Sequence, residues 1–332
     1  MPLPILICDD SALARKQIAQ SLPKDWDISI SFAVDGVTCL ESIRQGKGDI
    51  VFLDLNMPVM NGYEVLEEIQ RNDLPAIVIV ISGDIQEKAY QRVRELGAID
   101  FIQKPINNTK LTSILEQYGI YKPGDYHSLS APVKSEKIEF RDALQEVSNI
   151  AMGHAGDLLG RLLDVFILLP VPNVNTFESS ELNMTLSHIA QHETVSAVSQ
   201  GFIGSGINGE AIMIFHDASF TDIAKLLKYE NMISNHLEIE VMNDISNILI
   251  GAFLNGLATQ LTIPFSQGKP YVLGQHAKIE SIIKNQQESW QKILTIEVNY
   301  VIQTHNIKCD LLLLFTEDSI PVIQTQIGYL LD

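Results

Sequence analysis

The sequence predicts two domains of different class, a parallel α/β domain followed by an α+β domain. Three observations support this prediction: a length of 332 residues, an N-terminal alternation of short apolar runs with helix-length segments, and a C-terminal pattern that occurs twice. At about 150 residues per domain, this length suits two domains that each bury a core. We expect the first domain over residues 1–120, a linker over 121–136 and the second domain over 137–332.

Five strand-sized apolar runs mark the N-terminal domain, and segments long enough for amphipathic helices separate them. Strands separated by helices are joined by crossovers, so we expect a doubly wound, five-stranded parallel sheet with helices on both faces. In such a sheet, ligands bind at the carboxyl ends of the strands. The five runs are Leu3–Cys8, Ile28–Ala33, Ile50–Leu53, Ala76–Ile81 and Ile99–Ile102.

The linker is rich in proline, glycine and serine and shows no sustained periodicity. Beyond it we expect a long helix at about 138–168, strands within 182–217 and a short helix at about 219–228. A second long helix at about 237–261, more strands within 271–316 and a final helix follow.

The sequence of the second domain indicates an internal repeat, because identical residues recur 98 positions apart. In the second copy, Ile296, Val298 and Tyr300 alternate with polar residues, which predicts an antiparallel sheet with one buried and one solvated face. We therefore expect internal pseudo-two-fold symmetry, with both long helices against a common sheet. The identical pairs are Ser148/Ser246, Asn149/Asn247, Ile150/Ile248, Gly153/Gly251, Leu159/Leu257, Leu163/Leu261 and Pro172/Pro270.

Composition excludes several classes of protein. With 41 acidic and 23 basic residues the net charge is −18, which disfavours nucleic-acid binding. No apolar stretch approaches the roughly 18 residues that a membrane span needs, and we expect no secretion signal, since no basic leader precedes Leu3–Cys8. Three widely spaced cysteines indicate neither a disulfide framework nor a thiolate metal site. A cytoplasmic protein fits best, and the sequence leaves open whether it forms a homo-oligomer.

Five polar groups follow the predicted strands and converge on one edge of the first sheet. Three clustered carboxylates would repel one another, and a hard divalent cation such as Mg²⁺ removes that cost. A carboxylate beside Mg²⁺, a lysine and a hydroxyl can accept a phosphoryl group. The five are Asp9, Asp10, Asp54, Ser82 and Lys104.

Together with the run Asp54–Pro58, Gly62 and the Lys104–Pro105 pair, these residues resemble the receiver domain of two-component response regulators, which has a flavodoxin-like fold. The resemblance covers about residues 1–120. It implies that Asp54 is phosphorylated by a histidine kinase or a small phosphodonor.

The same resemblance implies a role for each of the other residues. Mg²⁺ would be bound by Asp10 directly, by Asp9 mainly through water, by Asp54 and by the backbone carbonyl of Asn56. Lys104 and the Ser82 hydroxyl would contact the phosphoryl group, and the Phe101 ring would follow Ser82 on activation.

The two long helices carry matching polar residues. Glu146 and Asn149 are three positions apart on the first helix, and Asp244 and Asn247 have the same spacing on the second, so each pair lies on one helix face. A solvated helix face explains a single such pair, but not its duplication. The order of an acidic residue, Glu, Asn and a distant Pro resembles the CheC/CheX/FliY family of chemotaxis phosphatases over about residues 136–332.

That resemblance implies that the helix docks on a phosphorylated CheY-like receiver, where the Glu engages the receiver's lysine and the Asn aligns a water molecule on the aspartyl-phosphate. Asn cannot act as a base at neutral pH and can only orient water. Because Asp244 is one methylene shorter than Glu, the sequence favours Glu146 and Asn149 as the stronger site, with Asp244 and Asn247 secondary. This hydrolytic role requires amides that a docking partner can contact.

Two other patterns are assigned structural roles. His188 and His192 have no evident third zinc ligand, and the glycines over 201–209 read as a turn between strands. The leading hypothesis is a receiver fused to an aspartyl-phosphate phosphatase that acts in trans or in cis. The alternative is a phosphorylation-regulated, non-catalytic adaptor.

Overall fold

The computed structural model describes residues 2–124, 138–178, 194–226, 235–278, 292–302 and 307–331. The chain divides into two compact units, Met1–Glu146 and Val147–Asp332. The boundary between them along the chain falls within helix α6 (Phe140–Leu163). The domain limits at residues 120 and 137 remain sequence predictions.

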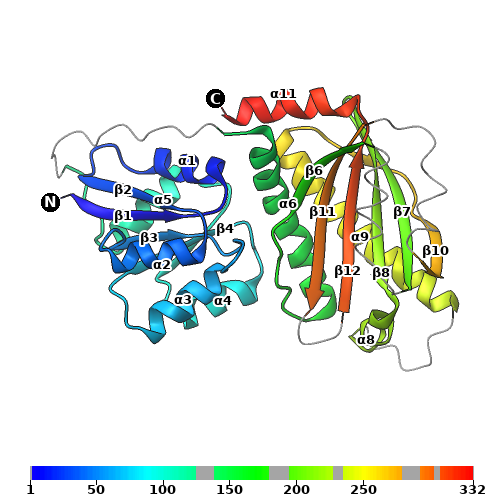
Figure 1. Ribbon diagram of the computed structural model, residues 1–332, viewed down its shortest axis with the longest axis horizontal. Helices are drawn as coiled ribbons and strands as arrows, with labels where there is room; N and C mark the ends of the chain where they lie inside the picture. The colour runs from blue at the N-terminus through cyan, green and yellow to red at the C-terminus, as the bar shows by residue number, and fades with distance from the viewer. Residues whose placement is uncertain are drawn as a thin grey trace. The chain divides into compact units, whose positions relative to one another are not determined.

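The first unit contains the expected five-stranded parallel sheet, with strand order β2-β1-β3-β4-β5 (Figure 1). Each strand lies within one residue of its predicted limits. The strands are β1 (Leu3–Cys8), β2 (Ile28–Ala33), β3 (Ile50–Leu53), β4 (Ile77–Ser82) and β5 (Asp100–Gln103), and the helices are α1 (Ala12–Ser21), α2 (Gly36–Arg44), α3 (Gly62–Arg71), α4 (Glu87–Glu95) and α5 (Asn108–Gln117).

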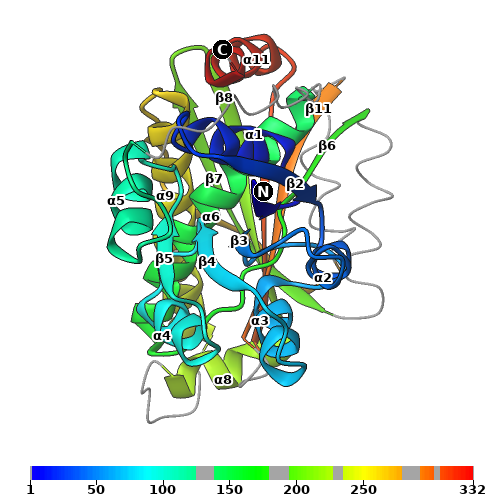
Figure 2. The same ribbon diagram turned by 90° about the vertical axis from the view of Figure 1, so that its left-hand side faces the viewer.

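Helices cover both faces of this sheet, with α2 and α5 on opposite sides (Figure 2). Isoleucines of β1 and β4 pack with Ile18 of α1 and Leu111 of α5 in one buried cluster. Strands β1, β3 and β4 are nearly continuous apolar runs because both of their faces are buried. In these three strands polar residues are therefore found only at the carboxyl ends, where the carboxylates lie.

Side-chain caps fix where the helices begin. Ser11 accepts a hydrogen bond from the backbone N–H of Ala14, so α1 starts at Ala12, three residues after Asp9. Asn61 and Glu64 form a capping box at the start of α3. Caps of this kind satisfy backbone N–H groups that lack a partner within the helix.

The second unit contains an antiparallel sheet, as the alternating pattern predicts, with strand order β10-β7-β8-β12-β11-β6 and β9 paired to β7. Its strands are β6 (Asn173–Glu178), β7 (Val195–Gly204), β8 (Ile207–His216), β9 (Ser266–Gln267), β10 (Tyr271–Ala277), β11 (Lys292–Ile302) and β12 (Ile307–Phe315), and its other elements are the 3₁₀ turn η1 (Asp217–Ser219) and helices α8 (Phe220–Leu226), α9 (Asn235–Leu261) and α11 (Ser319–Leu331).

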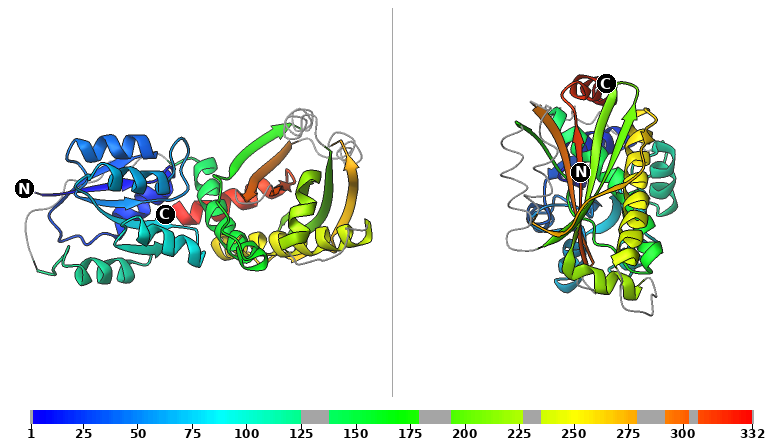
Figure 3. Two further views of the ribbon diagram at one scale, coloured as in Figure 1. Left: turned by 90° about the horizontal axis from the view of Figure 1, so that it is seen from below. Right: turned by 90° about the vertical axis from the view of Figure 1, so that its right-hand side faces the viewer.

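Helices α6 and α9 lie along one face of this sheet (Figure 3). They approach closely where Gly256 of α9 faces Ala151 of α6: a Cβ on Gly256 would lie 2.6 Å from the Ala151 Cα. The absence of a side chain at Gly256 therefore permits this separation of the two helix axes. Among the described residues, α9 is also the one helix long and apolar enough to span a membrane, but 61% of that window is buried inside the fold, as in a core helix.

The second unit departs from the sequence predictions in three places. The sequence did not predict β6 or β9. Thr295, one of the polar residues expected on the solvated face, is buried beside the unpredicted strand β6, where its hydroxyl donates to the Asn175 carbonyl 3.3 Å away and so keeps a hydrogen-bond partner. The glycine-rich segment does turn between strands, at Ser205 and Gly206, as expected. His188 and His192 lie outside the described residues.

Candidate functional site

The carboxyl edge of the parallel sheet brings together buried charged residues from separate strands. Asp9 follows β1, Asp54 follows β3 and Lys104 follows β5, and each is at most 2% exposed. The Lys104 Nζ atom lies 2.7 Å from Asp9 Oδ2 and 3.1 Å from Asp54 Oδ1. The lysine predicted to contact the phosphoryl group thus pairs with the predicted phosphoacceptor.

Backbone N–H groups orient both carboxylates. Asp54 Oδ2 accepts a hydrogen bond from Asn56 N at 2.8 Å, and Asp9 Oδ1 accepts one from Ser11 N at 2.9 Å. Gly62 is required beside this site, because a Cβ there would lie 2.2 Å from the Asp54 carbonyl oxygen. The motif glycine seen in the sequence therefore allows α3 to begin against the loop that carries Asp54.

The electrostatics of this edge favour a cation. Burial, together with the negative charge of Asp54, raises the pKa of Asp10 to about 7, and burial also raises the pKa of Asp9 well above its usual range. Burial opposes a charge on Lys104, but the carboxylates of Asp54 and Asp9 outweigh this effect and raise its pKa.

The oxygen donors at this edge are of the kind that Mg²⁺ prefers. Within the described part of the chain, no three His, Cys, Asp or Glu side chains are arranged to hold a metal ion, and Asp9 and Asp54 instead share Lys104. The donor chemistry fits Mg²⁺, and its binding by Asp9, Asp10, Asp54 and Asn56 remains a proposal.

The residues predicted to sense the phosphoryl group lie nearby. Ser82 is buried at the end of β4, and its Oγ accepts a hydrogen bond from Asp84 N at 3.3 Å. Phe101 on β5 is partly buried and contacts Tyr90 of α4 edge-on, with ring centroids 6.0 Å apart. A contact between α4 and this ring is what the predicted switch needs, since the ring can then transmit a change at Ser82 to a helix surface.

The first turns of α6 also contribute to the charged cluster of the first unit. Glu146 Oε1 lies 3.0 Å from Lys104 Nζ, and Gln145 Nε2 donates to Asp10 Oδ2 at 3.3 Å. Glu146 is only 3% exposed. The sequence predicts that Glu146 pairs with a receiver lysine, and here it pairs with the lysine of its own chain; the contribution of Gln145 was not predicted.

The two helices present their motif residues differently. Glu146 and Asn149 on α6 are buried, so this pair does not lie near the surface as its spacing suggested, whereas Asp244 and Asn247 on α9 are exposed. The Asn247 Oδ1 atom accepts a hydrogen bond at 3.3 Å from Nε2 of Gln200, a buried residue of β7. Sequence analysis did not identify Gln200, because β7 also contains Ser196 and Ser199 and no local pattern distinguishes one polar residue of the strand from another.

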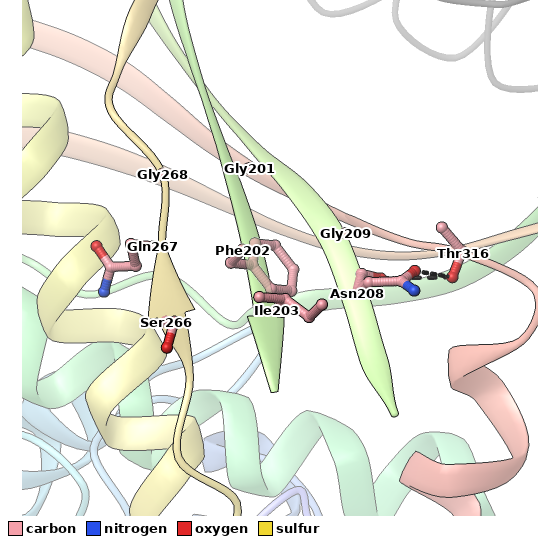
Figure 4. A pocket seen from close by; sticks show the side chains of 9 residues that line it. All are labelled: Gly201, Phe202, Ile203, Asn208, Gly209, Ser266, Gln267, Gly268 and Thr316. Carbon is pink, nitrogen blue, oxygen red and sulfur yellow. Dashed lines mark hydrogen bonds between the residues drawn. The ribbon is translucent and has the colours of Figure 1, made fainter. Parts of the chain in front are cut away.

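A cavity of about 560 Å³ opens where the turn between β7 and β8 meets β9 (Figure 4). Gln267 lines it and is also 3.4 Å from Gln200 Nε2. The other lining residues are Gly201, Phe202, Ile203, Asn208, Gly209, Ser266, Gly268 and Thr316.

Comparison with known proteins bears on the first unit. Residues 5–116 match the family model "Response regulator receiver domain". The N-terminal part of the chain is a receiver domain. The chain is 43% identical over 115 residues to the protein-glutamate methylesterase/protein-glutamine glutaminase 2 of Koribacter versatilis. This match covers 33% of this chain and 31% of that protein.

The matches to solved structures are also partial. The response regulator domain of Thermotoga maritima CheB is 28% identical, with a TM-score of 0.33, and the match covers 37% of this chain and all of that one. Thermotoga maritima FliY is 16% identical, with a TM-score of 0.44, over 58% of this chain and 98% of that one. The chain spans about a third of the length of the curated relatives it matches.

Proposed function

We propose that the protein is a cytoplasmic chemotaxis-type signalling enzyme in which a receiver domain is fused to a CheC-type phosphatase that hydrolyses the aspartyl-phosphate of a CheY-like receiver. The substrate is a separate receiver or the receiver of the same chain. A receiver-sized match to methylesterases does not extend to their catalytic activity, so that activity is not carried over.

In this proposal Asp54 accepts the phosphoryl group from a histidine kinase or a small phosphodonor. Asp9, Asp10, Asp54 and the Asn56 carbonyl would hold Mg²⁺, which would offset the negative charge of the transferring oxygens. Lys104, held between Asp9 and Asp54, is positioned to contribute a further positive charge.

The observation that carries the phosphatase role is the exposed amide of Asn247 on α9, three residues after the exposed carboxylate of Asp244. An exposed amide can be inserted beside a partner's acyl phosphate, where it orients the attacking water without taking its proton. The pairing of Glu146 with Lys104 gives separate support, because here a motif carboxylate lies 3.0 Å from the lysine of a receiver domain.

An internal duplication of the second domain is part of the proposal. Moving β6, β7 and β8 along the chain by 98 residues brings them to within two residues of the starts of β10, β11 and β12. The same shift relates α6 to α9. If β6, β7 and β8 are exchanged with β10, β11 and β12, the strand order β10-β7-β8-β12-β11-β6 becomes the same order read from the opposite edge of the sheet. A two-fold axis between β8 and β12 requires this relation.

The alternative is an adaptor that binds a partner without hydrolysis. The presence of Asp244 where the motif has Glu favours this alternative. The Asp side chain is one methylene shorter, so its carboxylate reaches less far toward the receiver's lysine, and a hydrogen bond to that lysine weakens with distance.

The test compares the loss of phosphate from a separate phosphorylated single-domain receiver with wild-type protein and with the Asn149→Ala, Asn247→Ala double variant. Faster loss with the wild type alone supports hydrolysis. Equal loss with both proteins, while both still bind the receiver, supports the adaptor.

A further inference from the structure

Three carboxamide side chains meet beside the Asn247 site of the second unit. Gln200 of β7 is 1% exposed, and its Nε2 atom lies 2.8 Å from the Gly268 carbonyl, 3.3 Å from Asn247 Oδ1 and 3.4 Å from Gln267 Oε1. Gln267 lies on β9, at the edge of the cavity in Figure 4. The exposed Asn247 is thus connected to the sheet interior through one buried residue.

The Gly268 carbonyl determines how these amides are oriented. A backbone carbonyl can only accept, so the Gln200 group 2.8 Å from it must be the NH₂ group. The N–H of Gly268 donates to the Gly201 carbonyl at 2.8 Å, which holds that peptide against β7.

The orientation of Gln200 in turn orients Asn247. Because Gln200 presents N–H groups, the Asn247 atom that faces it must be the acceptor Oδ1. The Nδ2 group of Asn247 is then turned away from the sheet. The exposed side of this residue is a hydrogen-bond donor, which suits anionic oxygen atoms.

The first helix has no equivalent arrangement. Ninety-eight residues after Gln200 the sequence has Val298, and the counterpart of Gln267 is Leu169; both are buried and apolar. A carboxamide that orients the motif Asn is therefore present beside α9 and absent from the corresponding positions beside α6.

We propose that Gln200 is a positioning residue that fixes the Asn247 amide as an outward-facing donor, so that α9 is the site that meets a phosphorylated receiver of another molecule. This inference rests on the proposed function. Asp244 adds an exposed carboxylate one turn earlier, so the surface matches a phosphoryl group beside an ammonium group. The α6 carboxylate, Glu146, is already paired with Lys104 of its own chain.

The first test uses ¹⁵N relaxation of the Asn247 side-chain NH₂ group in the full chain. In the wild type we expect an order parameter near that of rigid backbone, about 0.8, and in Gln200→Leu a fall below about 0.6. Gln267→Leu is the matched control, since it removes a competing acceptor but leaves the Gln200–Asn247 hydrogen bond in place. A disordered Asn247 in the wild type, or an equally ordered one in Gln200→Leu, overturns the inference without reference to any activity.

The second test measures phosphate loss from a separate receiver in an Asn149→Ala background, where hydrolysis depends on Asn247. Gln200→Leu should lower kcat about 3- to 10-fold, as expected for one hydrogen bond, and change KM less than twofold. An unchanged kcat, or a rise in KM alone, overturns the positioning role. Absence of hydrolysis in the Asn149→Ala parent refutes the proposed activity at α9, and the relaxation data then still decide whether Gln200 fixes the amide.

Discussion

The close approach of the two long helices allows a quantitative prediction for Gly256→Ala. The added Cβ would lie 2.6 Å from the Ala151 Cα and 2.9 Å from its Cβ, whereas ordinary contacts exceed about 3.4 Å. Because the nearest atom belongs to the backbone, the helices must separate. Overpacking costs about 1–3 kcal/mol, and alanine recovers up to about 1 kcal/mol of helix propensity.

The expected net loss is about 1–2 kcal/mol, which lowers Tm by about 2–8 °C for a domain of this size. The matched control is Gly328→Ala on α11, where an added Cβ meets no atom within 4 Å. This variant should be neutral or up to about 1 kcal/mol more stable. The assay is thermal unfolding followed by circular dichroism, and equal stabilisation by both substitutions would refute the close contact between α6 and α9.

Three further predictions concern the site and its charges. Asp54→Asn should abolish uptake of phosphate from a small phosphodonor, measured by intact-protein mass spectrometry, and persistent phosphorylation would show that another residue is the acceptor. Chelation of Mg²⁺ with EDTA should abolish the same uptake in the wild type, and added Mg²⁺ should restore it; uptake that is unaffected by EDTA would contradict the proposed site. The hydrogen bond with Asp217, aided by the charge of Glu238, raises the pKa of His276. The protonated His276 side chain therefore stabilises the fold fully below pH about 6.5, and this stabilisation is lost as the pH rises through the raised pKa. Urea unfolding should show the stability difference between wild type and His276→Gln shrinking from pH 6 to pH 9, and a constant or growing difference would contradict this assignment.

The receiver fold could be predicted from sequence because β1, β3 and β4 are apolar up to their last residue or two, and because polar or charged residues follow these strands. A parallel strand that is buried on both faces is easy to recognise in a sequence, because almost all of its residues are apolar. The residues Asp9, Asp54 and Lys104 were predicted to converge for the same reason, since the carboxyl ends of parallel strands share one edge.

The second domain was predictable in outline only. Strand β6 has the sequence Asn-Val-Asn-Thr-Phe-Glu, in which few apolar residues mark a strand, and its pairing with β11 joins segments more than 100 residues apart. The contact of Gln200 with Asn247 likewise spans 47 residues. Such polar contacts depend on tertiary packing, which local periodicity does not encode.

We propose that the C-terminal domain hydrolyses aspartyl-phosphate on a receiver. The most direct test is the amount of inorganic phosphate released per molecule of the Asp54→Asn variant when a separate phosphorylated receiver is supplied in large excess. This variant removes transfer to Asp54 as another route for phosphate loss. We expect many phosphates released per protein molecule, well above spontaneous decay, whereas release at the spontaneous rate would contradict hydrolysis by this domain.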